Sequence, residues 1–96
     1  MNPVKDFMNS REFQSMKSEH TKDMAIFVLQ AIQAIGKQRR RDLLFVVEHR
    51  VRDAELQRIL VRLVDSGVVE RIVKIPDNGK GRKKPDVYYA LGAIYR

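Results

Sequence analysis

The residues whose side chains suggest chemistry are arginines and a glutamine on one face of a predicted helix. From Asp53 to Ser66, apolar residues recur at i, i+3, i+4, i+7 and i+8, and this spacing predicts a helix with one buried face. The opposite face carries Ala54, Gln57, Arg58, Val61 and Arg62. Arginine can make two hydrogen bonds to guanine, and glutamine can make two to adenine. This face is therefore a candidate for contact with nucleic-acid bases.

Val61 and Arg62 each allow a more specific expectation. Val61 is an apolar residue on an otherwise polar face. It is either partly buried against the preceding helix or free to contact the methyl group of a thymine. We expect Arg62 to reach a phosphate rather than a base.

Basic residues are concentrated in two stretches of the chain, which has a net charge of +7. Residues 37–62 contain eight basic and four acidic side chains, and residues 74–84 contain five and one. The basic residues expected to contact nucleic acid, beyond those on the helix face, are Lys37, Arg39, Arg40, Arg41, Arg52, Lys80, Arg82, Lys83 and Lys84. Either stretch alone could be an ordinary solvated surface. The two together favour a polyanionic partner.

No set of residues in the sequence has the pattern of an enzyme or metal site. The chain has no cysteine, and His20 and His49 are far apart, whereas a zinc site needs several ligands at characteristic spacing. Asp53 and Glu55 are two residues apart and would point to different faces of a helix. The Gly-Lys-Gly sequence at 79–81 lies in a predicted hairpin, so we interpret it as a turn rather than a phosphate-binding loop. We expect no catalytic residues, no metal and no cofactor.

Length and composition predict a single small domain. The chain has 96 residues, of which 44% are hydrophobic, enough for one small core. The longest mostly apolar stretch, residues 24–35, is too short to span a bilayer. The N-terminal residues do not resemble a signal peptide, and the lack of cysteine fits the cytoplasm. The expected location is therefore cytoplasmic.

Two further helices are predicted before residue 53. Residues 22–35 should form a mostly buried helix that begins at an N-cap on Thr21 and ends at Gly36. Residues 42–50 should form a second helix, and the basic residues between the two could include a short strand. The helix at 53–66 would have either Arg52, with Glu55 as its capping partner, or Asp53 as its N-cap.

A β-hairpin is predicted after Gly67, which supplies the left-handed residue that commonly ends a helix. Its strands would be residues 68–75 and 86–91, joined by a basic loop over residues 76–85. Alternation predicts that the second strand turns Val87, Tyr89 and Leu91 inward and Asp86, Tyr88 and Ala90 outward. Ile94 and Tyr95 are expected to cover the base of the sheet.

Two segments of the chain resemble the winged helix-turn-helix family. Residues 60–71 are similar to the region where a helix of these proteins ends at a glycine before a strand, and residues 81–91 are similar to their wing. From Lys22 to Leu91, the pattern resembles PadR-like and MarR-like regulators and the small winged-helix proteins of archaea and their viruses and plasmids. The resemblance implies an α+β fold with a three-helix core and a β-hairpin wing. It also implies that the helix at 53–66 enters the major groove of double-stranded DNA while the loop at 76–85 lies over the flanking minor groove or backbone.

Residues 1–21 are predicted as an addition to this domain, which would occupy residues 22–96. They would form either an amphipathic helix that begins near Asn2-Pro3 or a partly disordered arm. Their apolar side chains need a covering surface, and we expect a second copy of the chain to supply it. The residues expected at this dimer interface are Val4, Phe7, Met8, Phe13 and Met16. A homodimer would place its recognition helices roughly 34 Å apart on palindromic DNA. It would make about 6–10 phosphate contacts.

The function expected from these features is sequence-specific binding of double-stranded DNA, most often in transcription regulation. One alternative is an architectural or plasmid-partition protein that coats DNA. An alternative of another class is a winged-helix module that docks on a second protein through the apolar residues of the N-terminal segment.

Overall fold

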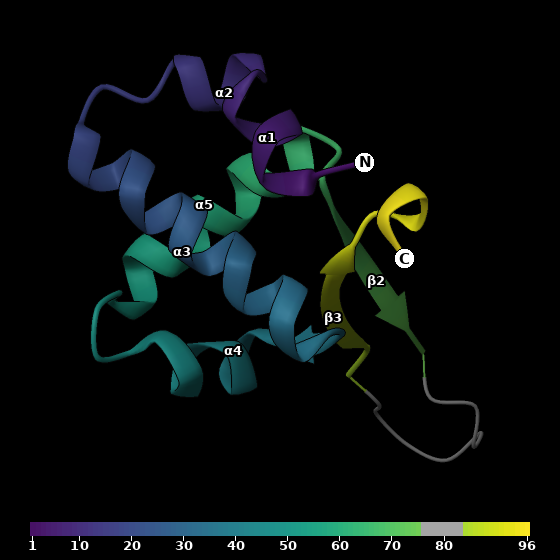
Figure 1. The fold of residues 1–96 in the computed structure, drawn as a ribbon. Helices are drawn as coiled ribbons and strands as arrows, with labels where there is room; N and C mark the ends of the chain where they lie inside the picture. Colours follow the sequence, from purple (N-terminus) through teal and green to yellow (C-terminus); the bar gives the residue numbers. More distant parts are fainter. Residues whose placement is uncertain (76–83) are drawn as a thin grey trace.

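The computed structural model describes residues 1–75 and 84–96, and Figure 1 shows their arrangement. The elements in chain order are α1 (Pro3–Met8), α2 (Arg11–Gln14), α3 (Glu19–Ile35), β1 (Gln38–Arg39), α4 (Arg40–Val47), α5 (Asp53–Asp65), β2 (Val69–Lys74), β3 (Asp86–Leu91) and the 3₁₀ helix η1 (Ala93–Tyr95). The three strands form one antiparallel sheet, and α3, α4 and α5 lie on one side of it (Figure 1). The chain is therefore of the α+β class, and the order of its elements is compatible with a winged-helix-like arrangement.

The N-terminal segment forms two short helices rather than one helix or an arm. The side chain of Asn2 accepts hydrogen bonds from the first turn of α1, and Pro3 follows it as the first helical residue. The chain then turns at Asn9 and Ser10, where the Ser10 hydroxyl accepts a hydrogen bond from the backbone N–H of Phe13 and begins α2. Serine and asparagine favour such positions because their side chains replace the missing backbone acceptor.

Three of the five apolar residues predicted for a dimer interface are buried within the single chain. Phe7 is fully buried, Phe13 is 8% exposed and Met16 is 7% exposed. The rings of Phe7 and Phe13 meet edge to face, with 5.4 Å between their centroids. The expectation that these three side chains need a second chain to cover them is wrong, because the N-terminal segment packs them onto its own domain. Val4 is half-buried, and Met8 remains exposed.

Helix α3 begins earlier than the sequence predicts. Its N-cap is Ser18 instead of Thr21: the backbone N–H of Thr21 donates to the Ser18 hydroxyl over 3.4 Å. The predicted end is confirmed, since Gly36 has a φ of 82°, a left-handed value that favours glycine. Five residues of α3 are buried, namely Met24, Ala25, Val28, Leu29 and Ile32.

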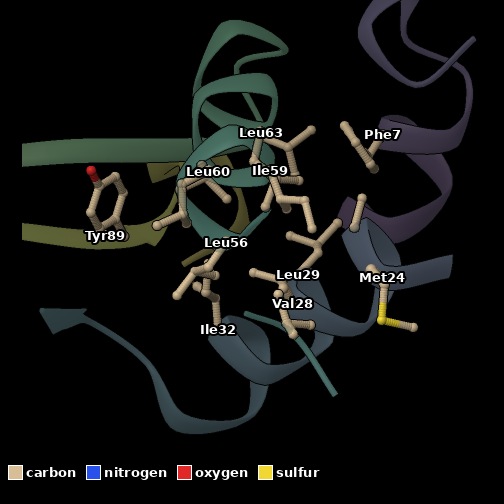
Figure 2. Close-up of a cluster of buried hydrophobic side chains, with 14 of the residues drawn as sticks. Phe7, Met24, Val28, Leu29, Ile32, Leu56, Ile59, Leu60, Leu63 and Tyr89 are labelled. Carbon is tan, nitrogen blue, oxygen red and sulfur yellow. The ribbon is translucent and has the colours of Figure 1, made fainter. Parts of the chain in front are cut away.

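The core lies where α3 and α5 pack together beside the sheet (Figure 2). Helix α5 contributes Leu56, Ile59, Leu60 and Leu63, each at most 1% exposed. These side chains point toward Val28, Leu29 and Ile32 of α3, with Phe7 of α1 at one end of the cluster and Tyr89 of β3 at the other (Figure 2). The predicted apolar face of α5 is therefore confirmed. Its burial fixes which residues of α5 face solvent.

The sheet has the strand order β1-β3-β2. Arg39 of β1 and Ile72 of β2 are both paired with Tyr88, on opposite sides of the central strand β3. The predicted inward residues Val87, Tyr89 and Leu91 pack against the core. Ala90 belongs to the predicted outward series and is only 2% exposed, so this end of the outward face is covered.

The C-terminal residues join both the N-terminal helix and the sheet. The Tyr95 hydroxyl donates a hydrogen bond to the Asp6 carboxylate over 2.5 Å, and Arg96 forms an ion pair with Glu70. Figure 1 shows η1 beside the start of the chain. Tyr95 packs against the core. Contrary to the prediction, Ile94 is 65% exposed and does not cover the sheet. Within residues 1–75 and 84–96, no helix has the length and apolar character needed to cross a membrane.

Candidate nucleic-acid interface

Helix α5 begins after a tight connection from α4 that buries Val51 completely. Arg52 is the N-cap, and its side chain makes no capping hydrogen bond. Glu55 does not serve as the capping partner; its carboxylate instead lies 3.7 Å from Nε2 of His20. The Leu56 N–H donates to the Arg52 carbonyl over 2.8 Å, which starts the helical hydrogen-bond series. The exposed start of α5 is therefore held by buried apolar residues rather than by a side-chain cap.

All the residues predicted to face outward on α5 are exposed. They are Ala54, Gln57, Arg58, Val61 and Arg62. Val61 is 49% exposed, so its side chain is open to a ligand rather than buried against α4. The structure brings these side chains together on one face of α5, between the N-terminal segment and the sheet.

A groove of about 470 Å³ lies on one side of this face, between α5 and residues 15–21. Three cationic side chains, those of Lys17, Arg58 and Arg62, line it together with Met16 and Ile59. Nη1 of Arg62 donates a hydrogen bond to the Ser15 hydroxyl over 3.0 Å. Because the hydroxyl is neutral, this bond orients the guanidinium without cancelling its charge.

A smaller groove of about 210 Å³ lies on the other side, between α5 and the sheet. Gln57 and Val61 line it from the helix, and Arg71 and Tyr89 line it from the strands. Arg71 was not among the predicted site residues. The sequence carried no signal for it, because its position beside Gln57 depends on how β2 packs against α5.

A third, open hollow surrounds the N-terminal end of α5. It is lined by His20, Arg50, Arg52, Ala54, Glu55 and Arg58. Arg50, which was also not predicted, is held in place by Phe27, with the guanidinium carbon 4.4 Å from the ring centroid. Three arginines therefore gather where a helix N-terminus already favours negative charge.

The three consecutive arginines that precede α5 have three different environments. Arg40 forms an ion pair with Asp53 at the start of α5. Arg41 is exposed on α4. Arg39 lies on the sheet, where Nη2 donates to the Tyr88 hydroxyl over 3.2 Å and lies 3.4 Å from the Asp86 carboxylate. The Tyr88 hydrogen bond, followed by the charge of Asp86, raises the pKa of Arg39. The three side chains therefore do not share one environment.

The basic loop of the predicted wing is described only at its end. Lys80, Arg82 and Lys83 lie outside the described residues. Lys84 is exposed just before β3. Within the described ranges, no group of three or more His, Asp or Glu residues is placed to hold a metal ion. Comparisons of the chain with models of protein families, with curated proteins and with solved structures found no match.

Proposed function

We propose that this protein is a winged helix-turn-helix protein that binds double-stranded DNA in a sequence-specific way. In this proposal α3, α4 and α5 are the three-helix core, and β2 and β3 are the strands of the wing. The observation that carries the proposal is the division of α5 into a fully buried apolar face and an exposed face with Gln57, Arg58 and Val61. A helix divided in this way can enter a major groove without loss of its packing.

The residues near the N-terminus of α5 are proposed to read bases. Arg58 would bind a guanine and Gln57 an adenine, each through two hydrogen bonds, and Val61 would contact a thymine methyl group. Ala54 is small enough to let the helix approach the base edges closely. These contacts would determine which DNA sequence is preferred.

The surrounding cations are proposed to bind the DNA backbone. Arg50 and Arg52 border the N-terminal hollow, and Arg62 borders the groove on the side of residues 15–21. Lys84, with Lys80, Arg82 and Lys83, would contact the backbone or minor groove beside the recognition helix. Such contacts position the protein and supply most of the salt dependence, but they carry no sequence information.

Regulation of transcription is the proposed role, because it is the usual role of the family that the sequence resembles. A homodimer on a palindromic site remains part of the proposal. Its interface cannot be built from Phe7, Phe13 and Met16, which are buried in one chain. The same burial removes most of the surface on which a protein-docking role depended.

The test compares the affinity of the protein for a selected DNA site with its affinity for random DNA. DNA sites would first be enriched from a random pool by the wild-type protein, and affinity for the enriched site would then be measured at physiological salt. We expect the enriched site to bind at least about a thousandfold more tightly than random duplex. Equal affinity for the two would reject sequence-specific binding.

The matched variants are Arg58→Ala and Lys5→Ala. Arg58→Ala should lose about 1–3 kcal/mol of binding free energy on the enriched site and relax the preference at one base position of each half-site. Lys5→Ala also removes one positive charge, but from an exposed position on α1. It should leave the base preference unchanged. A base preference that survives intact in Arg58→Ala would contradict the assigned role of this residue.

A further inference from the structure

A second group of cations surrounds Tyr88 on the outward face of the sheet. Nζ of Lys37 lies 5.1 Å from the centroid of the Tyr88 ring, Cζ of Arg39 lies 5.4 Å from it and Nζ of Lys74 lies 5.7 Å from it. Lys37 directly precedes β1, Arg39 is in β1 and Lys74 is in β2, so all three cations converge on the central strand β3. We refer to Lys37, Arg39, Lys74 and Tyr88 as the sheet cluster.

The charges of the sheet cluster are not balanced within the described part of the chain. Asp86 pairs with Arg39, and Glu70 pairs with Arg96. Lys37 and Lys74 have no ion pair within residues 1–75 and 84–96. Lys74 lies close enough to Lys37 to lower its pKa, through a side-chain contact and through charge repulsion. Two neighbouring ammonium groups repel one another, and an anion placed between them would relieve that repulsion.

The sheet cluster and the exposed face of α5 lie on opposite sides of the sheet. Tyr89 points into the core and borders the groove shared with Gln57 and Val61 of α5. Tyr88 is the adjacent residue of the same strand, so its side chain points to the other face. A duplex bound along α5 therefore meets the inner side of the sheet and not the sheet cluster.

We propose that the sheet cluster binds the phosphodiester backbone of a second DNA duplex, so that one chain can hold two DNA segments. Lys37 and Lys74 would share a backbone phosphate, and Arg39 would lie beside it. Cations already flank the Tyr88 ring, which favours backbone contact over stacking of a base. Duplex DNA is the occupant because its phosphates carry the negative charge that a patch of exposed cations attracts, and because the other face is proposed to bind DNA. The inference rests on that proposed function both for the choice of DNA as the occupant and for the second segment held at α5.

The experiment measures bridging of two duplexes by the full-length chain. One short duplex carries a donor dye and another carries an acceptor dye, and energy transfer reports their capture by the same protein. The test variant is Lys37→Ala/Lys74→Ala, in which both changed residues are exposed. The matched control is Lys5→Ala/Arg11→Ala, which removes two exposed cations from α1 and α2. Thermal melts establish that all variants fold alike, and sedimentation gives the oligomeric state of each.

We expect wild type and control to bridge the duplexes. Lys37→Ala/Lys74→Ala should bridge them at least about threefold less at low salt. Its affinity for a single enriched site should change less than about twofold. Inorganic phosphate should reduce bridging no more than chloride does at the same ionic strength, because a duplex offers the site many linked phosphates. Stronger competition would mean that the site takes free phosphate, and this would overturn the assignment to DNA.

Two results would overturn the inference while leaving the proposed function intact. One is bridging by Lys37→Ala/Lys74→Ala at the wild-type level, which would place both duplexes on the α5 faces of a dimer. The other is tight binding of one duplex by wild type without any bridging.

Conversely, the variant Gln57→Ala/Arg58→Ala tests the α5 site. If it keeps full site preference while Lys37→Ala/Lys74→Ala loses bridging, the proposed reading by α5 fails and the sheet cluster stands.

Discussion

At the scale of single residues, the hydrogen-bond or ion-pair partner of an arginine changes how strongly it can attract a phosphate. Arg40 is paired with Asp53, so its charge is largely offset at the start of α5. Arg62 is hydrogen-bonded to the neutral hydroxyl of Ser15, so its full charge remains available. Both residues are arginines on the surface, and their sequence neighbours do not distinguish them. The partner of each side chain, rather than its type, decides which one can attract a phosphate.

Tyr95 should make the stability of the protein dependent on alkaline pH. Its hydrogen bond to Asp6 is the largest cause that raises its pKa above the ordinary value near 10. The stabilisation is therefore fully present below about pH 10 and is lost as pH rises through the higher folded-state pKa, since the phenolate cannot donate a hydrogen bond. The measurement is the free energy of unfolding as a function of pH between neutral and strongly alkaline conditions.

The matched variant is Tyr95→Phe, which keeps the ring and removes the hydroxyl. At neutral pH it should cost about 0.5–1.5 kcal/mol of unfolding free energy. It should also lack the part of the alkaline decline that comes from Tyr95. An identical decline in wild type and Tyr95→Phe would show that other groups, rather than the Tyr95–Asp6 contact, cause it.

At the scale of elements, α1 and α2 are part of the core rather than an addition to it. Phe7 of α1, Phe13 of α2 and Met16, which follows α2, belong to the same buried cluster as the apolar residues of α3 and α5. Residues 15–21 then form one wall of the groove beside Arg58 and Arg62. The N-terminal segment therefore shapes the proposed DNA-binding surface as well as stabilising the helix that carries it.

Phe7→Ala should strongly destabilise the protein. Phe7 is fully buried, and its removal would leave a cavity beside Phe13 in the core. Buried phenylalanine-to-alanine changes cost about 3–5 kcal/mol, a large fraction of the stability of a small domain. Chemical denaturation measures this cost. The control is Met8→Ala on the same helix, an exposed position where the change should be within about 0.5 kcal/mol. Similar small costs at both positions would contradict the packing of α1.

At the scale of the whole molecule, positive charge is present on both sides of the sheet. One region surrounds α5, and the other is the sheet cluster around Tyr88. With a net charge of +7, the protein should attract DNA before any specific contact forms. Two separate cationic faces also give a physical basis for an architectural role, the alternative that the sequence suggested.

The salt dependence of binding should report the number of backbone contacts. The logarithm of affinity should fall linearly with the logarithm of salt concentration, and Lys84→Ala should reduce that slope by about 1 for each copy of Lys84 that contacts a phosphate. The variant should weaken binding to all sequences alike, because backbone contacts carry no sequence information. Binding isotherms on the enriched site and on random duplex, each over a range of salt, measure this. A change in base preference would instead place Lys84 against a base edge.

The sequence by itself determined the elements whose cause is local. The period of apolar residues predicted α5 and its exposed face, glycines marked the ends of α3 and α5, and alternating residues predicted β3 with the observed bounds Asp86–Leu91. These features depend on backbone preferences and on the spacing of side chains within one element. These predictions agree with the structure because the tertiary fold buries the same faces that the apolar pattern indicates.

Only the tertiary structure decided which elements meet. It placed Phe7, Phe13 and Met16 inside the chain. It also separated Arg39 from Arg40, and brought Arg50 and Arg71 to the surface around α5. It also gathered Lys37, Arg39 and Lys74 around Tyr88 from segments that are distant along the chain. The physical reason is that such contacts arise from packing and strand pairing between remote segments, and no local pattern in the sequence encodes the partner.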